Sequence, residues 1–68
     1  MDVYEVSFID AKGATIGNCQ LVRLVSELPP IVRGGMALSN CVRILLTPED
    51  NPKDALVLWM RPGLLVLG

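Results

Sequence analysis

The sequence contains no histidine, so it lacks the side chain that most often acts as an acid or base near neutral pH. It contains two cysteines, Cys19 and Cys41, which are too few for the disulfide framework of a small secreted protein. A tetrahedral zinc site needs four nitrogen or sulfur ligands, and two thiols do not supply them. We therefore expect no enzyme activity, no catalytic residues, no metal and no cofactor. We interpret the cysteines as buried, reduced thiols, with a disulfide between them as the alternative.

The sequence also lacks an excess of charge of either sign. Six lysines and arginines stand against seven aspartates and glutamates, and the formal net charge is −1. This balance does not favour nucleic acid as a partner, because nucleic-acid-binding domains carry a basic footprint. The longest apolar run is residues 55–60, far below the ~18 residues of a membrane helix. Residues 1–5 have no signal-peptide character. We expect a cytoplasmic protein that does not act at a membrane.

Apolar residues are abundant for such a short chain. They make up 51% of the 68 residues, and eleven of them are leucines, whereas only Tyr4, Phe8 and Trp59 are aromatic. A chain of this length forms one domain, residues 1–68, and a domain this small buries only about 60% of its unfolded surface. Some of the aliphatic side chains should therefore form an exposed patch or an interface.

Strand patterns dominate the chain. Residues 3–9 alternate apolar and polar, which predicts a half-buried strand, and residues 10–13 predict a turn into a second strand that starts at 14–16. Further strands are predicted at 41–46, at 55–60 (apolar on both faces) and at 64–67. The predicted fold is mainly β, a small five-stranded antiparallel barrel or sandwich.

Three segments interrupt this pattern. Residues 19–25 are interpreted as the continuation of the second strand, although a helix over 19–28 would make the fold α+β. Residues 26–39 are interpreted as a long surface loop, because Pro29-Pro30 favour an extended chain and Gly34-Gly35 a flexible one. One short helical turn is predicted near 48–51, with Thr47 as its cap.

Six residues are candidates for partner binding. Arg33, Gly34, Gly35 and Met36 are predicted to form a mobile recognition loop, in which a guanidinium beside glycines can approach an acidic group closely. Trp59 and Arg61 belong to the residue types that dominate the binding energy of protein interfaces. The simpler interpretation of residues 33–36 is a flexible turn with an exposed arginine. For Trp59 and Arg61 it is a core tryptophan, with Met60 as a filler and an exposed arginine at the following turn.

These observations predict a non-enzymatic module that binds another protein, or a second copy of itself, through an apolar sheet face or edge. Small intracellular proteins without catalytic residues are often inhibitors or adaptors, and many are encoded by phages or other mobile elements. We therefore expect an inhibitor or adaptor of this kind. Two alternatives stay open: a dimeric nucleic-acid-binding regulator, and a structural subunit of a homo-oligomeric assembly.

Overall fold

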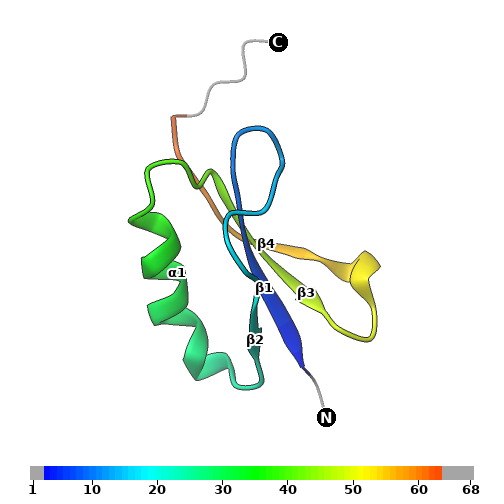
Figure 1. Cartoon of the computed structure of the whole chain (residues 1–68). Coiled ribbons are helices and arrows are strands. Elements are labelled where there is room, and N and C mark those ends of the chain that lie inside the picture. Colours follow the sequence, from blue (N-terminus) through cyan, green and yellow to red (C-terminus); the bar gives the residue numbers. More distant parts are fainter. Residues whose placement is uncertain (1–2, 64–68) are drawn as a thin grey trace.

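The computed structural model describes residues 3–63 of the chain. In this part of the chain an open antiparallel sheet of four strands, in the order β2-β1-β3-β4, carries one α-helix on one of its faces (Figure 1). The elements are β1 (Tyr4–Ile9), β2 (Gln20–Val22), η1 (Val25–Glu27), α1 (Leu28–Met36), β3 (Arg43–Pro48), η2 (Pro52–Asp54) and β4 (Leu56–Met60), where η denotes a 3-10 helix. The prediction of a mainly β, antiparallel fold is confirmed.

The predicted five-stranded barrel or sandwich is not confirmed. The sheet does not close, because β2 and β4 lie at its two edges and each pairs with one neighbour. The predicted strands at 3–9, 41–46 and 55–60 correspond to β1, β3 and β4. The predicted strand at 64–67 lies outside the described residues.

The turn after β1 follows the prediction closely. The Asp10 side chain accepts hydrogen bonds from the backbone N–H groups of Lys12 and Ala14, each 2.9 Å long. Gly13 supplies the positive φ of +86° that the turn requires. The returning chain makes an isolated bridge between Thr15 and Ile9, and regular pairing resumes only at β2. The strand predicted over 19–25 is therefore shortened to three residues.

The interpretation of residues 26–39 as a loop is wrong, because α1 begins at Leu28. Pro29 and Pro30 lie in the first helical turn, where the missing N–H groups would have had no partner within the helix. Leu28 adopts the helical conformation that a following proline disfavours, and it packs against the core. The alternative helix over 19–28 is wrong as well, because its first half contains β2.

The short helical turn predicted near 48–51 forms a few residues later, at Pro52–Asp54. β3 continues through Pro48, and the turn forms instead as η2, after Asn51. The pattern of a polar residue followed by proline occurs at both Thr47-Pro48 and Asn51-Pro52. Only the second site holds a turn, because Thr47 and Pro48 are paired with Glu5 and Tyr4 in the sheet.

The core lies between α1 and the sheet. Val6, Val22, Cys41 and Ile44 are buried there, and larger side chains pack around them, including Phe8, Ile31 and Trp59. The helix comes unusually close to the sheet at Gly35. A Cβ atom at this position would lie 2.6 Å from Cδ1 of Ile44 and 2.8 Å from Cε1 of Phe8. A glycine is therefore needed where α1 crosses these two side chains.

Candidate functional site

The first predicted site segment, Arg33–Met36, forms the last turn of α1 and is not a mobile loop. Gly35 is buried against the sheet, whereas Arg33, Gly34 and Met36 are exposed on the outer part of the helix. The two glycines thus have different roles: Gly35 allows the close packing of α1, and an added Cβ at Gly34 would meet open space. Whether Arg33 and Met36 contact a partner stays a prediction.

The second predicted site segment, Trp59–Arg61, is joined to the first by the Arg61 side chain. Nε of Arg61 donates to the carbonyl of Cys41 at 2.9 Å, and Nη2 donates to the carbonyls of Leu38 at 2.7 Å and Met36 at 3.3 Å. The guanidinium also lies over the ring of Trp59, 4.9 Å from its centroid.

These contacts give Trp59 and Arg61 a role inside the chain. The guanidinium binds carbonyls at the C-terminal end of α1, where the helix dipole favours a positive charge. Trp59 is half-buried and packs against the core. The position of Trp59 agrees with the simpler interpretation, whereas Arg61 is not an exposed arginine, because it is half-buried and donates to three carbonyls. Contact of either residue with a partner stays a prediction.

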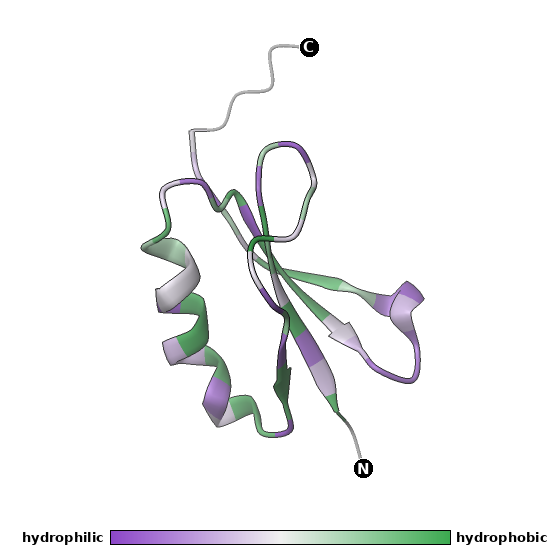
Figure 2. Ribbon diagram, viewed as in Figure 1, coloured by the Kyte–Doolittle hydropathy of each residue, from purple (hydrophilic) through white to green (hydrophobic). Residues whose placement is uncertain are grey.

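β4 exposes more apolar surface than the predicted site residues do. Leu56, Val57 and Met60 are 61%, 52% and 56% exposed, and we call these three residues the β4 patch. Val57 and Met60 lie on one face of the sheet, whereas Leu56, the partner of Leu46, lies on the other. β4 is coloured as hydrophobic along most of its length, although it lies at the sheet edge (Figure 2). The sequence did signal this patch, because residues 55–60 are apolar on both faces; our site prediction took only Trp59 and Arg61 from this region.

A β-bulge determines which β4 side chains reach the core. Ile44 pairs with Trp59 and Leu45 pairs with Val57, so Leu58 is an extra residue between them. Leu58 and Trp59 consequently both pack against the core, although they are neighbours in the strand. Val57 and Met60 are left on the opposite face, beside Leu45 and Arg43.

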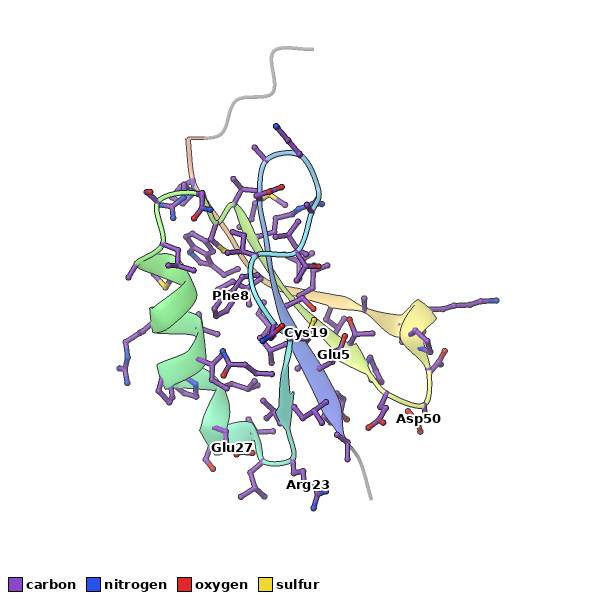
Figure 3. All side chains as sticks on the ribbon, in the orientation of Figure 1. Glu5, Phe8, Cys19, Arg23, Glu27 and Asp50 are labelled. Atoms are coloured by element: carbon purple, nitrogen blue, oxygen red, sulfur yellow. The ribbon has the colours of Figure 1, made fainter. Side chains whose placement is uncertain are left out.

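The face of the sheet opposite α1 is covered by no other helix or strand of the described residues (Figure 1). Phe8 points toward α1 and Glu5 points away from it, so alternate residues of β1 belong to this second face (Figure 3). We call it the open face. From the strand register its residues are Glu5, Ser7, Ile9, Leu21, Arg43, Leu45, Thr47, Val57 and Met60, of which Ser7 and Ile9 are buried. It combines exposed apolar side chains with one acid and one base.

A second exposed apolar group lies at the corner where β2 leads into η1. Leu21, Leu24 and Val25 are exposed there, and a shallow groove runs between Leu21, Leu24, Arg23 and Glu27. The carboxylate of Glu27 accepts hydrogen bonds from the backbone N–H groups of Leu24 (2.8 Å) and Arg23 (2.9 Å). These bonds, with a smaller contribution from the Arg23 charge, lower the pKa of Glu27 below its usual value of 4.5.

Both cysteines are free thiols, but only one is buried as predicted. Cys41 lies in the core and contacts the carbonyl of Arg43 at 3.3 Å. Cys19 is exposed, and its Sγ lies 3.2 Å from the hydroxyl of Ser7. Residues 3–63 contain no group of three or more histidine, cysteine, aspartate or glutamate side chains that could hold a metal ion.

In the same part of the chain, no helix is long and apolar enough to cross a membrane. No family model matches the chain, and neither the curated proteins nor the solved structures contain a match to it.

Proposed function

We propose that this chain is a protein-binding module that docks through β4. The observation that supports the proposal is the exposure of the β4 patch: three of the five side chains of the strand are more than half exposed, and all three are apolar. Aliphatic side chains of this size gain about 1.5–3 kcal/mol each from full burial, so an uncovered strand of this kind favours association.

The arrangement of β4 favours contact through its side chains over extension of the sheet by another strand. The bulge at Leu58 breaks the regular spacing of peptide groups that a partner strand would need. At the other edge, β2 has only three residues. The partner is therefore expected to bury Val57 and Met60 on the open face, while Arg61 holds the end of β4 in place against α1.

The test is site-specific photo-crosslinking in the cells that produce the protein. A photoreactive residue at position 60 should yield a discrete covalent adduct, because Met60 is expected to lie in the interface. The same residue at position 25 is the control, because Val25 is 80% exposed but lies on η1. Val57→Lys should abolish the adduct from position 60, since it places a charge in the apolar contact.

Two results would contradict the proposal. One is the absence of a discrete adduct from position 60. The other is an adduct that forms equally from position 25, because it would show that exposure alone determines the crosslink. Val57 is half exposed, so Val57→Lys should leave the unfolding transition close to that of the unmodified chain, which circular dichroism checks.

A further inference from the structure

The open face carries one acid and one base, and the strand register places them symmetrically. Ser7 on β1 and Leu45 on β3 are direct partners at the centre of the face. Glu5 lies two residues before Ser7 on β1 and pairs with Thr47 on β3. Arg43 lies two residues before Leu45 on β3 and pairs with Ile9 on β1. Because the strands are antiparallel, the two charges lie on opposite sides of the central pair.

The two charges do not meet within one chain. Four residues along a strand, at about 3.3 Å each, and one strand spacing of about 4.8 Å separate their Cα atoms by about 14 Å. Both side chains lie on the same face of the sheet. Each is left at one end of the face, with Leu45 and Val57 paired between them.

We infer that the open face binds the open face of a second copy of this chain, with a two-fold axis across the strands at the level of Leu45 and Val57. This inference rests on the proposed function, because Val57 and Met60 belong to both the β4 patch and the open face. Such an interface is isologous, so every contact occurs twice. Rotation about the axis reverses the strand direction and moves the Glu5 end of one copy over the Arg43 end of the other.

This arrangement brings opposite charges of the two copies within reach of each other and also buries apolar side chains of both. Facing sheets pack about 10 Å apart, so Glu5 of one copy and Arg43 of the other lie about 11 Å apart at Cα, within reach of the two long side chains. Leu45 and Val57 lie beside the axis and pack against the same residues of the second copy. A partner without this two-fold pattern would have to supply a base and an acid at the same two positions.

The dimer is expected to be weak. A sheet face of four short strands is small beside the roughly 800 Å² per partner of a standard interface. Association should therefore be measured from about 10 μM to about 1 mM, the range in which small interfaces associate. Sedimentation equilibrium should show a species of twice the 7.4 kDa chain mass at the upper end of this range.

Charge reversal tests the arrangement sharply. Glu5→Arg places two bases opposite each other in each half of the dimer, and Arg43→Glu places two acids opposite each other. Each variant alone should associate at least about tenfold more weakly than the unmodified chain. An equimolar mixture of the two variants should restore the dimer, because every pair across the axis then has opposite signs. Val57→Lys should weaken association as well, whereas Val25→Lys should not.

The outcomes separate this inference from the proposed function. An unmodified chain that stays monomeric at about 1 mM, single variants that dimerise normally, or a mixture that does not dimerise would each overturn the two-fold arrangement. If Val57→Lys alone abolished association, β4 docking would stand and this arrangement would be wrong. An adduct from position 60 that contained only another protein would have the same meaning. Glu5→Lys and Arg43→Asp replace either variant that fails to fold by circular dichroism.

Discussion

Gly35 shows how a single residue sets the distance between α1 and the sheet. Gly35→Ala would add a Cβ that overlaps Cδ1 of Ile44 and the ring of Phe8, and Ile44 is fully buried. The overlap should outweigh the gain in helix propensity and destabilise the fold by about 1–3 kcal/mol. Gly34→Ala is the matched control, because its Cβ meets open space; it should stabilise by about 0.5–1 kcal/mol. Urea denaturation measures both, and equal effects of the two substitutions would contradict the close packing.

Glu27 couples stability to pH through its two backbone hydrogen bonds. Its pKa is lowered in the folded chain, so the ionised carboxylate stabilises the fold above the unfolded-state pKa of 4.5. That contribution is lost as the pH falls through the lower, folded-state pKa. Glu27→Gln should therefore be less stable than the unmodified chain at pH 7, and the difference should disappear at acidic pH. Thermal unfolding across pH measures it. Glu49→Gln, at an exposed acid with the same charge change, is the control; the same pH-dependent difference there would contradict the assignment.

At the scale of elements, the Arg61 side chain joins the end of α1 to the end of β4 by hydrogen bonds, beside the apolar packing of Leu58 and Trp59 in the core. Arg61 donates to three carbonyls around the end of α1, two of which follow the last helical residues. Arg61→Met keeps much of the stem beside Trp59 but removes the donors, and it should cost about 1–3 kcal/mol, since the carbonyls lose charged donors. Amide exchange should accelerate at Ala37, Leu38 and Cys41, whose N–H groups bond within this turn.

The control for this substitution is Arg33→Met, which removes an exposed guanidinium from the same helix. It should change stability by less than about 0.5 kcal/mol, because surface substitutions away from special contacts have small effects. Equal losses for the two variants would show that Arg61 acts through general charge. A loss specific to Arg61, with faster exchange confined to residues 37–41, would show that it holds the helix end.

For the whole molecule, the balance of buried and exposed apolar surface is the central feature. Among the described residues, five hydrophobic side chains are buried, whereas eight large ones are exposed, and four of these eight lie on the edge strands β2 and β4. One helix covers one face of a four-stranded sheet, and a domain this small has few further residues with which to cover the other. The β4 patch and the open face follow from this shortage, and both proposed interactions use it.

The sequence by itself determined the local features that depend on neighbouring residues. The alternation of Tyr4, Val6 and Phe8 predicted β1, and the Asp10–Gly13 chemistry predicted its turn, because both depend on short-range backbone preferences. The absence of histidine argued against an enzyme, and the apolar run at 55–60 favoured a protein that binds a partner through apolar side chains. The surplus of aliphatic residues predicted exposed apolar surface, although not its position.

The tertiary structure decided the features that depend on distant contacts. Pro29, Pro30 and the two glycines indicated a loop, but packing of Leu28 and Gly35 against the sheet made the same residues a helix. Arg61 was a candidate for partner binding, but folding brings its side chain to carbonyls 20 and 23 residues away, which it holds within the chain. The open face likewise required the register, since only strand pairing places Glu5 and Arg43 at opposite ends of one surface. Local preferences are weak, and long-range packing overrides them wherever the two conflict.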